Sequence, residues 1–495
     1  MSKEITLLSA TRLAQRIRKK ELKITEVIEA FLQHIDEINP SVNAISQLRT
    51  KEDLLQEAKE KETYLEKGLE PGPLFGVPVT VKESIMVKGL QLTNGDPMLK
   101  NNVAEEDALL VKRLKDAGAI IIGMTNLAFL SIDWQSANAW NDTTNNPYDL
   151  SRTAGGSSGG SSAAVAAFMS PISIGADAGG SIRVPAHFCG IYGLRPTENY
   201  ISNRGHLKVP GRPQGRRHIV TPGPFTNNLE DMGLAMKVLS NQSSHHLSEL
   251  PDLDFESSQW NQEPLNIAYS DSMNNVEIDA EYRSIFNAFI DSLKSEKMTL
   301  VQDHPIYDEK KAYLTANKVQ GFENGINFPN IPLLNWLLYL FIRIKYNDHL
   351  WALGMAKGVR LSSAAYAKAI DAKDEFSDNY HAFLSKYDVW ITPVCAIEAF
   401  EHQKAGKPFV INGKKVPYTK AIASYTFTSA LSGHPILVIP IGKKKNGLPV
   451  GVQIHSRKWT DNRLIQIAQH LEEIVNKKYL DAVNQDVAFH QVNMH

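Results

Sequence analysis

The first part of the chain, to about residue 65, repeats apolar positions with the spacing of an α-helix. The apolar face of the first clear repeat consists of Val27, Ile28, Phe31, Leu32, Ile35 and Ile38. We expect this helix to begin after Thr25, as its N-cap, and to stop at Asn39 and Pro40. Charged residues 51–67 then indicate a solvated helix that Gly68 closes. The pattern therefore predicts a helical N-terminal segment.

From residue 76 onward, the apolar positions form short, uninterrupted runs, which are typical of strands buried on both faces. These runs occupy residues 77–82, 119–123, 172–175, 265–269, 387–392, 436–441 and 450–454. Helical patterns lie at residues 105–117, which Gly118 closes, and at residues 161–168 and 461–475. Because strands come from distant parts of the chain, we expect an α/β protein built on one large sheet.

We interpret residues 1–495 as a single domain. Its segments are residues 1–66 (N-terminal helices), 67–240 (core), 260–385 (a mostly helical cap) and 386–495 (strands and a helix that complete the sheet). The polar residues 240–259 predict a surface excursion between the two halves.

One stretch, residues 331–342, is apolar at nearly every position and contains Trp336. It is too short to cross a bilayer, which takes roughly 20 apolar residues. It is either a helix of the core or an exposed apolar helix that lies on a membrane surface or lines an acyl channel. The sequence leaves both interpretations open.

Composition and charge narrow the class of protein. The chain is 43% apolar and 22% charged, which is typical of a soluble globular protein. Its net charge of −1 provides no global field for nucleic acid or anionic membranes. The two cysteines, Cys189 and Cys395, are too far apart in sequence for a disulfide framework or a clustered metal site. Residues 1–22 lack a secretory apolar core, so we expect a cytoplasmic protein.

Two serines in glycine-rich loops carry the strongest chemical signal. Ser157 lies in Ala-Gly-Gly-Ser-Ser-Gly-Gly (residues 154–160), and Ser181 ends Asp-Ala-Gly-Gly-Ser (residues 177–181). Glycine lets backbone N–H groups approach a ligand, and a hydroxyl beside them suits a nucleophile that faces an oxyanion. The candidate oxyanion donors are the N–H groups of Ala178, Gly179, Gly180 and Ser181. On context alone, Ser157 is the first candidate for the nucleophile.

Two common motifs with such loops do not fit. Residues 155–159 satisfy the G-x-S-x-G pattern of the nucleophile elbow, but that elbow follows an apolar strand. Here the preceding residues 145–153 are polar and rich in turn formers. A phosphate-binding P-loop fails as well, because the required Lys-Ser or Lys-Thr pair does not follow.

A serine nucleophile needs a base. His187 is the nearest histidine, but its setting does not suggest this role. Lys82 ends an apolar strand, where burial would favour the neutral amine and lower its pKa toward that of a usable base. A lone lysine at a strand end is more often a charge that faces solvent, so Lys82 gains weight only together with the serines.

Together, these residues resemble the amidase signature family. The resemblance runs through residues 76–83, 155–161, 175–186 and 189–197 and reappears at residues 433–435 and 447–453. The order and spacing of these segments are far more specific than one glycine motif. The resemblance implies an amidase signature fold, with a large mixed sheet sandwiched between helices (α/β/α) and a helical cap region.

The resemblance also implies a Ser-cisSer-Lys triad. Lys82 matches the base, Ser157 matches the bridging serine that follows a cis peptide bond, and Ser181 matches the nucleophile. It thus moves the nucleophile from Ser157 to Ser181. The oxyanion-hole turn falls on residues 178–181, and Ser131 falls where a backbone carbonyl lines the site. No cofactor and no metal are implied.

Asp177 and Arg183 flank the Ser181 turn, and we expect them to pair and to support it. The activity implied is hydrolysis of a small-molecule carboxylic acid amide through an acyl-serine. Residues 331–342 resemble the apolar cap of fatty acid amide hydrolases, which implies a fatty acyl or aryl amide and peripheral membrane contact. The alternatives are a glutaminase-type subunit of a tRNA-dependent amidotransferase and a non-catalytic binding protein. Direct nucleic-acid binding is not expected, and a homodimer is left open.

Overall fold

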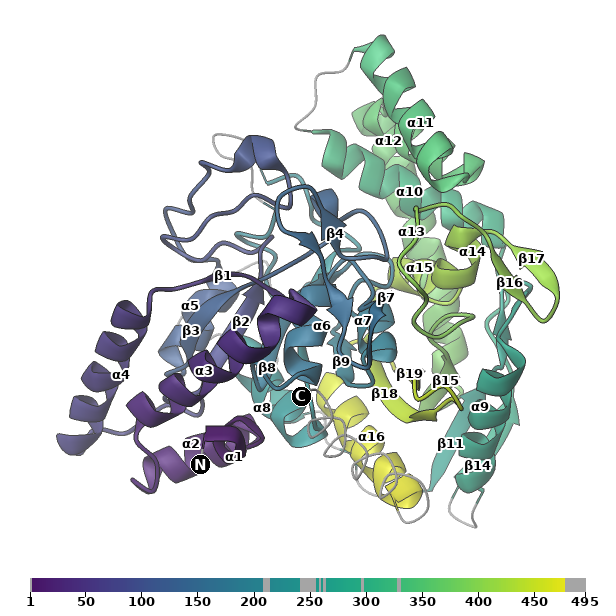
Figure 1. Cartoon of the computed structure of the whole chain (residues 1–495). Coiled ribbons are helices and arrows are strands. Elements are labelled where there is room, and N and C mark those ends of the chain that lie inside the picture. Colours follow the sequence, from purple (N-terminus) through teal and green to yellow (C-terminus); the bar gives the residue numbers. More distant parts are fainter. Residues whose placement is uncertain are drawn as a thin grey trace.

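One mixed sheet organises the molecule (Figure 1). The computed structural model describes residues 2–207, 214–240, 255–257, 260, 264–294, 298–326 and 331–476. Within these residues, eleven strands form the sheet in the order β1 (Ile45–Leu48), β3 (Ile120–Thr125), β2 (Pro78–Lys82), β8 (Ile172–Asp177), β10 (Thr221–Thr226), β9 (Tyr192–Arg195), β18 (Ile436–Lys443), β19 (Pro449–His455), β15 (Val389–Pro393), β11 (Leu265–Tyr269) and β14 (Met298–Gln302). The single sheet with strands from both parts of the chain is confirmed.

The direction of the strands changes across the sheet. β2 runs parallel to both β3 and β8, and β11 runs parallel to both β15 and β14. The central strands pair in antiparallel fashion. Because β2 and β8 are parallel neighbours, their carboxyl ends lie at the same edge of the sheet. That edge is where the sequence places Lys82 and the turn that leads to Ser181.

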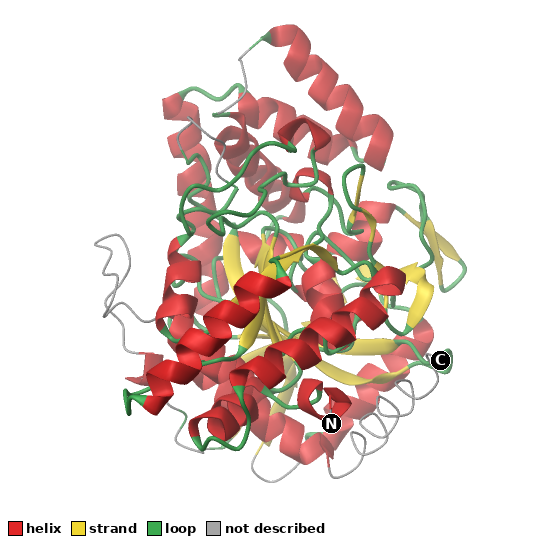
Figure 2. Ribbon diagram, turned by 60° about the vertical axis from the view of Figure 1, so that its left-hand side comes forward, coloured by secondary structure: helices red, strands yellow, loops and turns green. Residues whose placement is uncertain are grey.

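Helices cover both faces of the sheet (Figure 2). They are α1 (Ser2–Thr6), α2 (Ala10–Arg18), α3 (Ile24–Val42), α4 (Lys51–Glu66), α5 (Leu109–Asp116), α6 (Gly159–Ala166), α7 (Arg183–Phe188), α8 (Leu229–Ser240), α9 (Ala280–Ser292), α14 (Tyr418–Ala423), α15 (Phe427–Leu431) and α16 (Asp461–Asn476). Short two-stranded ribbons lie outside the sheet: β4 (Ala137–Asn138) with β5 (Asp142–Thr143), β6 (Asn145–Asn146) with β7 (Asp149–Thr153), β12 (Ser272–Met273) with β13 (Val276–Glu277), and β16 (Phe409–Ile411) with β17 (Lys414–Val416).

A group of four consecutive helices packs together outside the sheet (Figure 1). It consists of α10 (Glu309–Gly325), α11 (Pro332–Tyr346), α12 (His349–Val359) and α13 (Ser363–Leu384). These helices lie within the segment expected to form a cap, although the strands β11 and β14 from the same segment join the main sheet.

Two expected features of the N-terminal helices are wrong. Thr25 lies inside α3 and does not cap it, because its N–H and hydroxyl both donate to Glu62 of α4. Pro40 does not stop the helix, which continues to Val42. The chain leaves the helix at Asn43, whose φ of 53° places it in the left-handed region.

Two other helices are displaced from their predicted bounds. The pattern predicted a helix from residue 105, but α5 begins at Leu109. The residues before it are tied elsewhere: Asp107 accepts from the Lys88 N–H, and the Ala108 N–H donates to the Met86 carbonyl. The helix predicted at residues 161–168 is α6, which begins earlier, at Gly159. The predicted surface excursion at residues 240–259 lies mostly outside the described residues.

The apolar stretch at residues 331–342 forms most of α11, and its side chains are largely exposed. The exposed fractions are 62% for Leu333, 56% for Trp336 and 50% for Phe341. The interpretation as a buried core helix is therefore wrong. Of the helices within the described residues, none is long and apolar enough to cross a membrane.

Candidate active site

Lys82 and Ser157 form a buried hydrogen bond at the carboxyl edge of β2. The distance from Lys82 Nζ to Ser157 Oγ is 2.6 Å, and both residues are 1% exposed. Burial, the largest cause, and the positive charge of Arg216 together lower the pKa of Lys82 to about 7. A substantial share of the Lys82 amines is therefore neutral near neutral pH and able to accept a proton.

The loop around Ser157 is anchored on both sides. The Gly156–Ser157 peptide bond is cis, as the family resemblance implies. The Ser157 carbonyl accepts hydrogen bonds from the Ala128 N–H and the Ser136 hydroxyl. On the other side, the Ser158 hydroxyl donates to the Ala176 carbonyl of β8 at 3.1 Å. The loop thus lies against the end of the strand that leads to Ser181.

The turn that carries Ser181 is shaped by two glycines that no other residue can replace without a shift. A Cβ on Gly179 would lie 2.5 Å from the Phe427 ring, and one on Gly180 would lie 2.5 Å from the Thr426 hydroxyl. Gly180 also has a φ of +116°, which residues with a side chain rarely adopt. Ser181 itself is only partly buried.

Three of the four expected oxyanion donors are available, and one is not. The Gly180 N–H donates to Asp177 Oδ1 at 2.8 Å, so the expectation that it faces a substrate oxygen is wrong. No described residue accepts a hydrogen bond from the N–H groups of Ala178, Gly179 and Ser181. The Ala178 carbonyl accepts from Gln320 Nε2 of α10 at 2.9 Å. Because the peptide is planar, this bond turns the Gly179 N–H to the opposite side.

The expected pair of Asp177 and Arg183 is confirmed. Arg183 donates to both Asp177 oxygens at 3.0 Å, and both side chains are fully buried. Burial alone would raise the pKa of Asp177, but the charges of Arg183 and Arg195 hold it well below its usual range. Asp177 also accepts from the N–H groups of Gly180 and Ile182. The carboxylate therefore fixes both ends of the Ser181 turn.

Ser131 and His187 occupy different environments. Ser131 ends a short turn after β3, has a φ of 58°, and donates its hydroxyl to Asn94. It lies near Ser157 through Ala128, whose carbonyl accepts from the Ser131 N–H. His187 is buried elsewhere, between the Ile397 carbonyl and the Gly451 N–H. Burial lowers the pKa of His187 to about 4, which leaves it a neutral packing residue.

Distant residues that the sequence pattern did not single out complete the site. Trp134 Nε1 and the Thr426 hydroxyl both donate to the Gly179 carbonyl. With Gln320, they hold the turn from three separate elements. Neither periodicity nor a local motif marks these residues, because the fold alone brings them to the turn.

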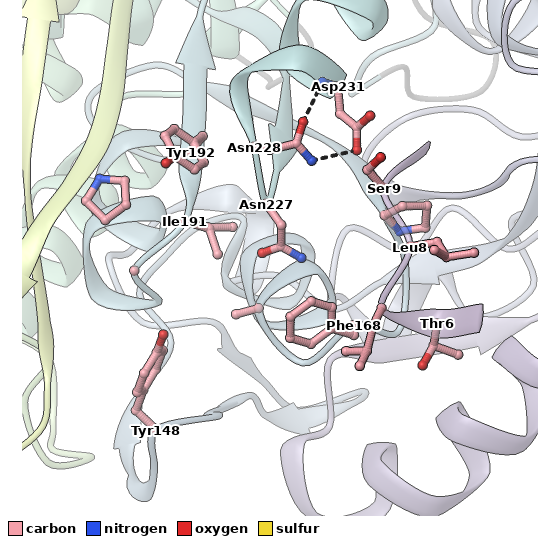
Figure 3. Close-up of a pocket in the computed structure, with 15 residues that line it drawn as sticks. Thr6, Leu8, Ser9, Tyr148, Phe168, Ile191, Tyr192, Asn227, Asn228 and Asp231 are labelled. Carbon is pink, nitrogen blue, oxygen red and sulfur yellow. Dashed lines mark hydrogen bonds between the residues drawn. The ribbon is translucent and has the colours of Figure 1, made fainter. Parts of the chain in front are cut away.

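A cavity of about 240 Å³ lies away from Lys82, Ser157 and Ser181 (Figure 3). Its wall includes Leu8, Tyr148, Phe168 and Tyr192, with Asn228 and Asp231 bound to each other by two hydrogen bonds. None of Lys82, Ser157 and Ser181 lines it. Among the described residues, no cluster of three or more His, Cys, Asp or Glu side chains is placed to hold a metal ion.

The comparisons with known proteins agree with this geometry. The model of the Amidase family matches residues 26–465. The chain belongs to the amidase family. The amidase signature resemblance is therefore confirmed, and with it the family's hydrolase character.

Three similar proteins are named for three different activities. The chain is 28% identical to an acylamidase of Rhodococcus erythropolis, over 96% of this chain and 98% of the relative. It is 29% identical to a glutamyl-tRNA(Gln) amidotransferase subunit of a Sulfurihydrogenibium species, over 94% and 97%. It is 27% identical to the human fatty-acid amide hydrolase 2, over 96% and 90%. The substrate of this chain is not determined by these similarities.

The solved structure of a fatty acid amide hydrolase shares the fold. It superposes with a TM-score of 0.77 at 23% sequence identity and covers 96% of this chain and 86% of that protein. The amidase signature fold, with its large mixed sheet between helices, is confirmed.

Proposed function

We propose that this protein hydrolyses a carboxylic acid amide to an acid and an amine through an acyl-Ser181 intermediate. The observation that carries the proposal is the buried 2.6 Å hydrogen bond from Lys82 to Ser157, next to a lysine pKa of about 7. A neutral lysine that is hydrogen-bonded to a serine can act as a general base, because the serine hydroxyl relays the proton to it.

In the acylation half-reaction, Ser157 passes its proton to Lys82 and takes the proton of Ser181. The Ser181 oxygen then attacks the amide carbon. The oxygen of the tetrahedral intermediate becomes negative and accepts hydrogen bonds from the turn, for which the N–H groups of Ala178, Gly179 and Ser181 are the candidates. The C–N bond breaks as Ser157 returns a proton to the amine and recovers one from Lys82.

In the deacylation half-reaction, water replaces the amine. Ser157 takes a proton from the water and passes one to Lys82, and the hydroxide attacks the acyl ester. When the tetrahedral intermediate collapses, the ester bond breaks and Ser181 recovers its proton through the same two residues. The products are the carboxylic acid and the regenerated enzyme.

We further propose that the acyl group is apolar, a fatty acyl or aryl chain. The apolar face of α11 supports this, since Leu333, Trp336 and Phe341 are exposed in the cap. A face of this kind binds an acyl chain, or docks on the membrane that contains one, with about 25 cal/mol per Å² of apolar surface buried. The names of the acylamidase and of the human fatty-acid amide hydrolase 2 among the relatives are consistent with the proposal.

The main alternative is the glutaminase-type subunit of a tRNA-dependent amidotransferase, the role named for several relatives. That role requires partner subunits, whereas the proposed hydrolase acts as an isolated chain. A non-catalytic binding protein is the other alternative, and the buried bond between Lys82 and Ser157 speaks against it.

The test is covalent labelling of the purified chain with a fluorophosphonate, followed by peptide mapping. We expect the label on Ser181 and none on the Ser181→Ala variant. A matched control is Ser385→Ala, because that exposed hydroxyl donates to the Ala382 carbonyl of α13 and should leave labelling intact. Acyl amides of graded chain length then report the substrate class. Labelling without turnover of any amide by the isolated chain would favour the amidotransferase role.

A further inference from the structure

We propose that Arg216 binds a carboxylate on the leaving amine, so that the preferred substrates are N-acyl amino acids. The inference rests on the proposed amidase function and adds the chemistry of the amine half of the substrate. Arg216 belongs to none of the motifs that the sequence pattern singled out.

The segment that carries Arg216 lies between two walls of the site. On the side of Lys82, the Ser84 hydroxyl lies 3.2 Å from His206 Nε2, and Gln214 Nε2 donates to the His206 carbonyl. On the other side, the Arg217 N–H donates to Glu323 of α10 at 3.0 Å.

α10 connects this segment to the Ser181 turn. Gln320, one helical turn before Glu323, donates to the Ala178 carbonyl. Gly215 packs against the same helix, since a Cβ on it would lie 2.4 Å from the Glu323 carbonyl oxygen. Arg216 is thus held between the strand end that carries Lys82 and the helix that contacts the oxyanion turn.

The carboxylate of Glu323, whose charge acts on Arg216, already has several hydrogen-bond partners. Glu323 accepts hydrogen bonds from the backbone N–H groups of Arg217 and His218. It also contacts His218 Nδ1 at 2.7 Å and accepts from the Tyr366 hydroxyl at 2.8 Å. Its oxygens therefore fix the loop backbone, and no ion pair joins them to the Arg216 guanidinium, although the charge of Glu323 acts on that group.

The guanidinium of Arg216 has no hydrogen bond or ion pair to any described residue. The residue is partly buried, and its nitrogen atoms are not among the fully enclosed polar atoms that lack a partner. The group is therefore open to a ligand from the site. Desolvating a cation without a partner is costly, and a bound anion would offset that cost.

At neutral pH Arg216 is a cation, whereas its neighbour His206 is uncharged. Burial lowers the pKa of Arg216 to about 10, so it stays protonated at neutral pH, and the charge of Glu323 opposes that shift. Burial and the charges of Arg216 and Lys82 hold the pKa of His206 well below its usual value, so His206 is neutral. Arg216 therefore supplies a positive charge to an anion on this side of the site.

The proton relay places the amine half of the substrate on this side. Ser157 must reach the leaving nitrogen to return its proton, and Lys82 lies directly behind Ser157. Groups attached to that nitrogen therefore extend toward the Lys82 side of the site, where Arg216 lies. A carboxylate one or two bonds beyond the nitrogen matches the flat, two-pronged donor set of an arginine.

The experiment compares N-lauroylglycine with N-lauroylethanolamine, which replaces the carboxylate by a neutral alcohol. Both are measured on the pH plateau in wild type, Arg216→Ala and Arg216→Lys. We expect wild type to prefer the glycine amide. In Arg216→Ala, the preference should fall about 10- to 100-fold, mainly through KM, and Arg216→Lys should restore part of it. Arg217→Ala is the matched control, because its side chain is exposed and only its backbone contacts Glu323.

The two proposals fail in different ways. Turnover of both amides with no preference, or an equal loss for both in Arg216→Ala, overturns the carboxylate site and leaves the amidase function standing. As a readout independent of turnover, N-lauroylglycine binding is measured calorimetrically on Ser181→Ala with and without Arg216→Ala. Equal affinities overturn the carboxylate site. Weaker binding without Arg216 supports it even if no amide is cleaved, an outcome that counts against the amidase function alone.

Discussion

At the scale of single residues, the chemistry of the site depends on the surroundings of a few buried, ionisable side chains. Lys82 is buried and its hydrogen bond goes to a serine hydroxyl, so the neutral amine is favoured although the charges of Asp177 and Glu83 oppose this. Asp177 is buried with Arg183, so its environment favours the carboxylate. Both side chains are fully enclosed, yet Lys82 is the proposed base, whereas Asp177 anchors the Ser181 turn. The difference lies in their partners and not in their burial.

The pKa of Lys82 predicts the pH dependence of catalysis. The base must be neutral, so kcat/KM for a neutral amide should rise tenfold per pH unit below about 7 and level off above it. An unperturbed lysine would be neutral in only about one molecule in three thousand at pH 7. A pH–rate profile of the purified chain checks this.

A variant of Arg216 provides a control for the pH–rate profile. Arg216→Gln removes the positive charge that lowers the pKa of Lys82, so the midpoint should move to higher pH. The shift should be smaller than the whole displacement from 10.5, because burial is the larger cause. A wild-type midpoint near that of free lysine would contradict the role of Lys82 as the base.

Asp177→Asn tests the anchor of the Ser181 turn. It leaves Arg183 buried without its counter-charge, so we expect a loss of about 3–5 kcal/mol in the free energy of unfolding. Because the pKa of Asp177 is lowered, its contribution is present at neutral pH and is lost only as the pH falls below about 4. Urea denaturation at pH 7 measures the effect.

The matched control is Asp149→Asn. Asp149 forms an ion pair of the same 3.0 Å length with Arg152, but the two side chains are 40% and 23% exposed. Exposed pairs contribute about 0–1 kcal/mol, so this variant should be nearly neutral. Equal losses of unfolding free energy in the two variants would show that burial does not determine how much the Asp177–Arg183 pair contributes to stability.

At the scale of elements, the sequence predicts best what depends on local pattern. The apolar runs located β2, β3, β8, β11, β15, β18 and β19, because strands buried on both faces leave a continuous signal. β10 escaped prediction because Thr-Pro-Gly-Pro-Phe-Thr contains two prolines and a glycine, which argue against a strand. It forms because its neighbours β8 and β9 pair with it.

The residues of the candidate site also fall into two groups: those that a local motif marks and those that only the fold brings to the site. Lys82, Ser157 and Ser181 were located through motifs, whereas Gln320, Trp134 and Arg216 reach the site only through the fold. The exposure of α11 could not be predicted from the sequence, because it depends on which elements pack against the helix. An apolar run of this length is equally compatible with a helix in the core. A sequence pattern reports composition along a helix, but not which face a neighbouring element covers.

The exposed face of α11 predicts binding to lipid. The triple variant Leu333→Ser, Trp336→Ser, Phe341→Ser should lose most of the cosedimentation with phosphatidylcholine vesicles that we expect of wild type. Its turnover of a short, water-dispersed amide should change much less. The control removes three scattered exposed apolar residues, Met98, Ile306 and Val410, and should leave vesicle binding intact. Equal vesicle binding by all three proteins, or none by wild type, would contradict membrane contact.

At the scale of the whole molecule, the site is built by both halves of the chain. The triad residues all precede residue 240, but Arg183 donates to Ser429 and Gln453, and the Gly179 carbonyl accepts from Thr426. The sheet shows the same dependence, because β9 pairs with β18 across the boundary between the halves. The candidate catalytic motifs therefore all lie in the first half of the sequence, but their geometry depends on residues of the second half.

This arrangement predicts the behaviour of a divided chain. Residues 1–250 expressed alone contain Lys82, Ser157 and Ser181, yet should not react with a fluorophosphonate, because Arg183 would lose its partners from the other half. Coexpression with residues 251–495 should restore labelling, since the cut lies between β10 and β11 and divides none of the strands described in the sheet. A version of the second half with Gln453→Ala should restore it less well than one with the exposed Val410→Ala. Strong labelling of the first half alone would show that the site assembles before the sheet is complete, and the halves would then be separate folding units.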